Sequence, residues 1–238
     1  MEHDHSPEAI EHRLARGPDA SYLRDWIYGG IDGAVTTFAV VSGVVGAELS
    51  STVIVVLGLA NLLADGFSMA ASNYSGTKAE QDQVEHLRRV EHRHIEEVPE
   101  GEREEIRQIF ALKGFEGETL DRIVEVISSD RERWVKTMLT EEYGLPLEAR
   151  SEWLAAASTF SAFLVCGAVP LLPYLIGLDH AFGLSIAATA VVFFLIGCGR
   201  GRWSVSPWWK TGFGTLAVGG IAAVLAYAVG HALRALAG

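Results

Sequence analysis

Apolar residues gather in five long stretches of the chain. These stretches cover residues 26–47, 53–74, 153–178, 181–199 and 211–230. Each is as long as the roughly 20 residues with which an α-helix crosses a bilayer. Three of them carry no charge, and the first two carry one acid each, Asp32 and Asp65. The pattern predicts an all-α, polytopic membrane protein with five transmembrane helices: helices 1 and 2 in residues 25–75 and helices 3 to 5 in residues 151–238.

Residues 1–24 are polar and precede the first apolar stretch. Within them, residues 6–15 have the pattern of a short amphipathic helix, with Ser6 suited to cap it and Pro7 to be its first residue. This favours a helix lying on the membrane surface over a catalytic role for the nearby histidines.

Residues 76–150 differ from the rest of the chain because they are rich in charge. No glycine or proline interrupts residues 77–98, so the helix of the second apolar stretch is expected to continue to Pro99, which ends it. Further helices are predicted over 100–113, from 118, and from Ser129, whose spacing to Glu132 suggests a capping box. We expect a helical insert between transmembrane helices 2 and 3.

Basic residues in the short loops predict the orientation in the membrane. They precede the first span and lie between the fourth and fifth spans, at Arg13, Arg16, Arg24, Arg200, Arg202 and Lys210. The other two short loops carry no Lys or Arg. The N-terminus and the insert are therefore expected to be cytoplasmic, with the C-terminus on the opposite side.

The charge of the 238-residue chain is distributed unevenly. The formal net charge is −11 although 49% of the residues are hydrophobic, and residues 76–150 hold 19 Asp and Glu against 12 Lys and Arg. An acidic chain lacks the basic face with which proteins bind nucleic acid. The two cysteines, 32 residues apart in apolar stretches, indicate neither a disulfide framework nor a thiolate metal site.

Polar side chains recur along one face of the first two spans. Asp25 and Asp32 are seven residues apart, and Asn61, Asp65 and Met69 follow each other at intervals of four. Carboxylates at membrane depth are costly and are usually kept for a function, so this stripe suggests a cation path. The alternative is hydrogen bonding between packed helices.

The insert offers three pairs of ligand-type side chains at helical spacing. The pairs are Glu91 with His94, Glu102 with Glu105, and Met138 with Glu142. Carboxylate, imidazole and thioether groups together suit Fe²⁺, Mn²⁺, Co²⁺ or Zn²⁺. A solvated acidic face and a docking surface for a partner are the alternatives. The Glu91-x-x-His94 pair also matches half of a di-iron signature, which leaves a ferroxidase open.

Several motifs in order resemble the vacuolar iron transporter family, whose yeast relatives are the vacuolar calcium cross-complementer proteins. They are Asp-Gly in the first span, Gly-Leu-Ala and Ser68-Met69 in the second, Tyr74-x-x-x-Lys78-x-Glu80, and Trp134-x-x-x-Met138-x-x-x-Glu142-x-Gly144-Leu145. The resemblance implies five spans, a homodimer with the ion path at its interface, a cytoplasmic metal-binding domain, and proton-driven export of Fe²⁺ from the cytosol.

Applied residue by residue, the resemblance makes Asp25, Asp32 and Met69 part of the path. It assigns Glu91, Glu102, Glu105, Met138 and Glu142 as ligands of the insert. His94 and Asn61 stand where the plant relatives have glutamate, and Asp65, one turn from Asn61, is the candidate substitute for the missing membrane carboxylate.

The sequence as a whole predicts a transporter and not an enzyme. The resemblance implies Fe²⁺ as the substrate, with Mn²⁺ or another divalent transition metal as a further candidate, exchanged for protons across the bilayer without a prosthetic group. A membrane-bound di-iron ferroxidase and a metal sensor are the alternatives. The short polar N-terminal segment suggests the plasma membrane of a microbe, where export would detoxify iron.

Overall fold

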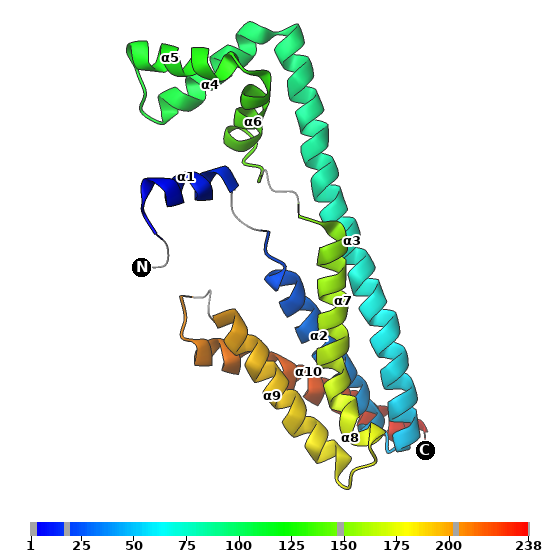
Figure 1. Ribbon diagram of the computed structural model, residues 1–238. Coiled ribbons are helices and arrows are strands. Elements are labelled where there is room, and N and C mark those ends of the chain that lie inside the picture. The colour runs from blue at the N-terminus through cyan, green and yellow to red at the C-terminus, as the bar shows by residue number, and fades with distance from the viewer. Residues whose placement is uncertain (1–3, 17–19, 147–149, 202–204, 238) are drawn as a thin grey trace. The chain divides into compact units, whose positions relative to one another are not determined.

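The computed structural model describes the chain apart from residues 1–3, 17–19, 147–149, 202–204 and 238. The regular elements of the described part are all helical, and this part contains no strand (Figure 1). Its elements are α1 (Pro7–Arg16), α2 (Leu23–Gly46), α3 (Ser51–Glu97), α4 (Pro99–Leu112), α5 (Gly117–Ser128), α6 (Arg131–Glu141), α7 (Glu152–Ala168), the 3-10 turn η1 (Val169–Leu171), α8 (Leu172–Leu175), α9 (Ala181–Gly201) and α10 (Trp208–Ala237).

Five helical segments are long and apolar enough to cross a membrane. They are Leu23–Gly46, the N-terminal part of Ser51–Glu97, Glu152–Leu175, Ala181–Gly201 and Trp208–Arg234. The all-α class and the helices able to span a bilayer are confirmed. Of the loop bases that predicted the orientation, Arg202 lies outside the described residues.

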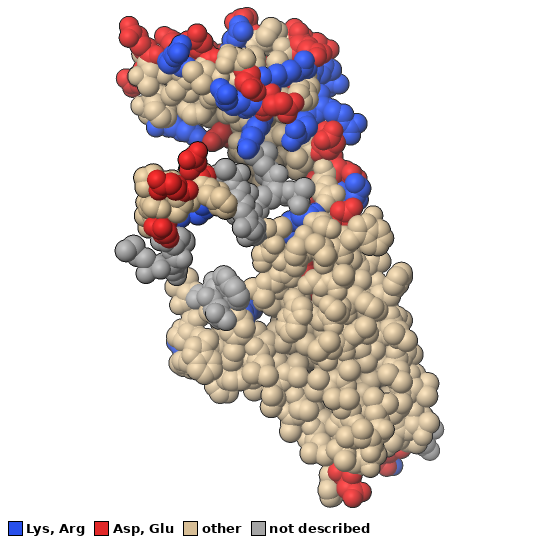
Figure 2. Space-filling model, viewed as in Figure 1, with Lys and Arg blue, Asp and Glu red and all other residues tan. Residues whose placement is uncertain are grey.

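The chain divides into two compact units. One contains residues 1–20 and 76–150, and the other contains residues 21–75 and 151–238. Charged side chains cover the first unit, whereas the visible sides of the second are almost entirely uncharged (Figure 2). Helix α3 runs without a break through residue 76, so the same helix contributes to both units.

The second unit, residues 21–75 and 151–238, contains the helices able to span a bilayer and is called the membrane unit below. In it, α2 packs against α7, α9 and α10. Two glycines allow α2 to approach α7 closely. A Cβ on Gly29 would lie 2.2 Å from the carbonyl oxygen of Thr159, and one on Gly33 would lie 2.4 Å from that of Phe163. Small residues at such contacts are the usual means of packing helices in membranes.

Helix α3 contributes to the same core through its apolar face. Ile54 and Leu62 lie in a buried cluster with Val41 of α2 and Phe163 of α7. This packing positions the polar face of α3 beside α2.

The insert has its own apolar core. It consists of Ile106, Val124, Ile127, Trp134 and Met138, contributed by α4, α5 and α6. Pro99 is the first residue of α4, so it ends α3 and starts the next helix, as its fixed φ allows.

The N-terminal caps of two helices test the predicted start signals. At α1, the Ser6 Oγ accepts a hydrogen bond from the Ala9 N–H at 3.4 Å, as predicted. At α6, the prediction of a Ser129 cap is wrong. Asp130 is the cap and accepts from the Arg133 N–H at 2.9 Å, while the Ser129 hydroxyl donates to the carbonyl of Val126 in the preceding helix.

Candidate cation path and metal-binding insert

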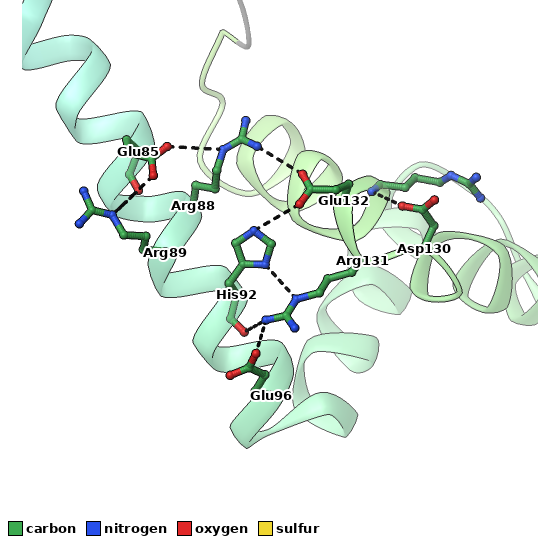
Figure 3. A network of polar contacts seen from close by, with 9 residues as sticks. Glu85, Arg88, Arg89, His92, Glu96, Asp130, Arg131 and Glu132 are labelled. Carbon is green, nitrogen blue, oxygen red and sulfur yellow. Dashed lines mark hydrogen bonds and ion pairs between the residues drawn. The ribbon is translucent and has the colours of Figure 1, made fainter.

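A polar network joins α3 to α6 in the insert (Figure 3). Arg131 donates from Nε to His92 Nδ1 at 2.9 Å and from Nη2 to the His92 carbonyl at 2.9 Å, and it pairs with Glu96. Arg88 pairs with Glu132 Oε2 at 3.3 Å. Each exposed pair is weak alone, but together they fix α6, which carries Met138 and ends directly before Glu142, along the stretch of α3 that carries Glu91.

Two glutamates of the predicted ligand set are buried. Glu91 of α3 is 1% exposed and Glu102 of α4 is 4% exposed. One oxygen of each is engaged: Glu91 Oε1 accepts from the Tyr143 hydroxyl at 3.0 Å, and Glu102 Oε1 lies 3.3 Å from His94 Nδ1. Within the described structure, no donor reaches the other oxygen, Oε2, of either residue. Buried carboxylate oxygens without donors are suited to a cation.

The charges of the predicted ligands act on one another. Burial raises the pKa of Glu102 to about 8, with Glu91, Glu105 and Glu142 adding to the effect. The protonated carboxyl of Glu102 can donate a hydrogen bond to Glu91. Partial desolvation, followed by the charges of Glu105 and Glu91, also raises the pKa of Glu142. The carboxylates of glutamates from α3, α4 and the end of α6 therefore repel one another, and a bound proton or metal ion would reduce this repulsion.

The remaining predicted ligands differ in depth. Met138 is fully buried in the apolar core with Trp134 and Ile106, whereas Glu105 and Glu142 are exposed. In the described part of the chain, no three His, Cys, Asp or Glu side chains have the arrangement of a formed metal site. The structure thus brings the acids into electrostatic contact without closing a ligand shell around them.

Tyr143 was missed by the sequence analysis. Its hydroxyl binds Glu91, and burial together with this hydrogen bond raises the pKa of Tyr143, so it remains a protonated donor. Its position directly after the predicted ligand Glu142 was the one feature of the sequence that could have indicated that Tyr143 belongs to the site.

In the membrane unit, α2 and α3 bring the predicted path residues together. The carboxylates of Asp32 and Asp65 are close enough to interact electrostatically. Asn61 donates to the Thr36 hydroxyl at 3.4 Å, and that hydroxyl donates to the Asp32 carbonyl at 2.8 Å. Met69 is partly buried against the apolar cluster of the bundle.

Asp25, in the first turn of α2, is 3% exposed and is held by two other helices. Asn73 of α3 donates to Asp25 Oδ1 at 2.9 Å and to the Thr159 hydroxyl of α7 at 2.7 Å. Neither Asn73 nor Thr159 was predicted to belong to the site. No sequence spacing could have paired them, because they are 86 residues apart.

The fold and the site together define a polytopic helical membrane protein with acids inside its bundle and an acidic helical insert. The sequence model of the VIT family matches residues 23–231. The chain therefore belongs to the VIT family, whose members are transporters and not enzymes.

Curated relatives match over most of their length. A vacuolar iron transporter of Toxoplasma gondii is 32% identical over 232 residues, which cover 92% of this chain and 76% of the relative. Vacuolar iron transporter 1 of Arabidopsis thaliana is 29% identical over 216 residues, with 89% and 86% covered. Its counterpart in Tulipa gesneriana is 30% identical over 229 residues, with 95% and 93% covered.

Proposed function

We propose that the chain carries Fe²⁺ across a membrane along the stripe of Asp25, Asp32, Asn61, Asp65 and Met69. The observation that carries this proposal is the pair of carboxylates, Asp32 and Asp65, which lie on two helices able to span a bilayer and are close enough to interact electrostatically. Two acids in such a place exceed what helix packing requires, and they suit a divalent cation that must shed part of its water. The names of the relatives support iron as the substrate.

The insert would collect the cation. Glu91, His94, Glu102, Glu105 and Glu142 supply oxygen and nitrogen ligands, and Met138 supplies a thioether from within the apolar core. The donor set fits, because two buried oxygens lack donors, and because burial, together with the neighbouring acids, raises the pKa of Glu102. A cation arriving there would draw the exposed acids inward and complete the shell.

Protons would be the counter-ions. Carboxylates that bind a metal must first lose a proton, so metal loading and proton release are linked at one group. The proposed direction is export from the cytosol, with the insert and the N-terminus cytoplasmic, as the loop bases suggest. A homodimer and a location in a microbial plasma membrane complete the proposal, and Mn²⁺ is a further candidate substrate.

At the position of Asn61, the resemblance implies a glutamate in the plant relatives. An amide can bind a metal through its oxygen, but it cannot release a proton near neutral pH. In the proposed path, Asp65, one turn further along α3 and beside Asp32, takes over the exchange of protons.

The test is uptake of Fe²⁺ into proteoliposomes that contain the full-length chain, under anaerobic conditions and an imposed pH gradient. Wild type is expected to transport, and Asp32→Asn is expected to lose flux at least about tenfold because one carboxylate of the pair is gone. Asp179→Asn, an exposed acid in the loop before α9, is the matched control and should behave as wild type. Equal flux in Asp32→Asn and wild type would reject the assignment of the path.

A further inference from the structure

Asn73 of α3 contacts both α2 and α7 near the start of α2. Its side-chain amide nitrogen lies 2.9 Å from Asp25 Oδ1, 2.7 Å from the Thr159 hydroxyl and 3.2 Å from the carbonyl of Ala155. All of these atoms belong to the membrane unit. The amide of one residue on α3 therefore links a carboxylate on α2 to the backbone and a side chain of α7.

The donors and acceptors of this cluster form an ordered chain. An amide has two hydrogens, and its two shortest contacts are the Thr159 hydroxyl and the Asp25 carboxylate. The Thr159 hydroxyl, which accepts from Asn73, directs its own hydrogen to the Asp25 carbonyl at 3.4 Å. Asp25 is thereby held at its carboxylate by α3 and at its backbone by α7, which fixes both its position and its rotamer.

The partner on α7 is itself fixed. Thr159 is 1% exposed, and the Thr159 carbonyl lies against Gly29, where α2 leaves no room for even a methyl group. Thr159, which anchors Asn73, therefore lies where α2 and α7 approach each other closely. Hydrogen bonds from a neutral amide to a carboxylate are among the stronger ones, and they are also directional.

We infer that Asn73 is a positioning residue for cation entry: it holds Asp25 in one orientation, with Thr159 as its anchor, so that the carboxylate meets the arriving cation without reorganising. This inference rests on the proposed function, in which Asp25 belongs to the path. Because Asn73 acts through Asp25 and does not bind the cation in this scheme, its loss affects capture of Fe²⁺ and leaves later steps unchanged.

The experiment measures initial rates of Fe²⁺ uptake against Fe²⁺ concentration in proteoliposomes with a fixed pH gradient. Asn73→Ala is expected to raise KM about tenfold, the size of one hydrogen bond to a charged group, with kcat within about twofold of wild type. Asn73→Gln, which keeps the amide donors, should recover most of the lost affinity. Ser75→Ala, an exposed hydroxyl two residues further along α3, is the matched control with wild-type kinetics.

A double-mutant comparison separates positioning from a general role in packing. In an Asp25→Asn background, Asn73→Ala should add less than a twofold change in KM, because the group it positions has lost its charge. An equal effect in both backgrounds, a wild-type KM in Asn73→Ala, or a fall in kcat alone would overturn the inference. If Asp25→Asn abolishes flux, the comparison of Asn73→Gln with Asn73→Ala decides, and absence of rescue rejects the positioning role.

If Asn73→Ala does not fold, Thr159→Val supplies the second variant, since it keeps the shape of the side chain and removes only the anchor. It should raise KM about threefold, less than the loss of the whole amide, and an unchanged KM would count against the inference. Failure of the proposed function is seen separately, because wild type would then show no uptake before any variant is compared.

Discussion

Glu102→Gln in the insert should have opposite effects on stability and on metal binding. In the metal-free protein, the buried carboxyl of Glu102 has a pKa of about 8, raised by burial and by Glu91 and Glu105. Ionising it in the folded state is therefore unfavourable. Glutamine keeps the shape and removes the charge, so the variant should be more stable than wild type at alkaline pH and should bind Fe²⁺ more weakly.

The sign follows from proton linkage. The folded pKa lies above the unfolded value near 4.5, so between these two pH values the folded state holds a proton that the unfolded state has released. Stability conferred by this group is complete below the unfolded pKa and is lost as the pH rises to about 8. Each pH unit within that window changes the free energy by about 1.4 kcal/mol. Between pH 6 and 8.5 the insert should lose about 2 to 3 kcal/mol.

Hydrogen exchange of the full-length protein in detergent measures this locally. With metal removed by a chelator, amides of α4 and α6 in wild type should lose about 30- to 150-fold in protection between pH 6 and 8.5, after correction for intrinsic exchange rates. Glu102→Gln should lose much less. Glu104→Gln, an exposed acid on the same helix, is the matched control and should keep the wild-type pH dependence.

Two results would refute this reasoning. One is wild-type protection that does not change with pH, which would mean that Glu102 ionises freely. The other is an equal loss in wild type and Glu102→Gln, which would place the titrating group elsewhere. Saturating Fe²⁺ should suppress the loss in wild type, because the metal replaces the proton as the partner of the carboxylate.

Three further predictions concern metal binding at Glu102, the cap of α6 and the contact between α2 and α7. The apparent affinity of the full-length protein for Fe²⁺, measured by calorimetry, should rise about tenfold per unit from pH 6 to 8 because Glu102 must release its proton, and a flat profile would contradict its role as a ligand. Asp130→Ala should destabilise α6 by about 1 kcal/mol by hydrogen exchange, whereas Ser129→Ala should change little; the reverse order would contradict the observed cap. Gly33→Ala should lower the free energy of unfolding by about 1 to 3 kcal/mol, because the added methyl group would clash with the Phe163 carbonyl. Gly214→Ala on α10, where there is open space around the glycine, should leave this free energy unchanged. Equal effects of the two substitutions would contradict the contact between α2 and α7.

The sequence predicted the spanning helices because long uncharged stretches have few other solutions in a bilayer. It also predicted the continuation of α3 past residue 76 to Pro99, since nothing between them interrupts a helix. The cap of α6 was mispredicted by one residue. Ser129 and Asp130 both carry a suitable oxygen, and the choice depends on which of them adopts extended backbone, which only Asp130 does.

Helical spacing identified which side chains share a face but not how deep they lie. Met138 and Glu142 are four residues apart on one face, yet the structure buries the first in the apolar core and leaves the second at the surface. Likewise, Glu91 and Glu102 were predicted as members of separate pairs, and only the packing of α3 against α4 brings them into contact. Whether these residues bind a metal stays a prediction.

The central claim is that cation movement along the α2–α3 stripe is exchanged for protons. It is tested most directly by recording Fe²⁺ uptake and internal pH together in the same proteoliposomes, with wild type, Asp32→Asn and Asp65→Asn. The account predicts that wild-type uptake of Fe²⁺ is accompanied by proton movement in the opposite direction, and that both fall together in each variant. Fe²⁺ flux that is unchanged when the pH gradient is abolished, with no proton movement, would contradict it.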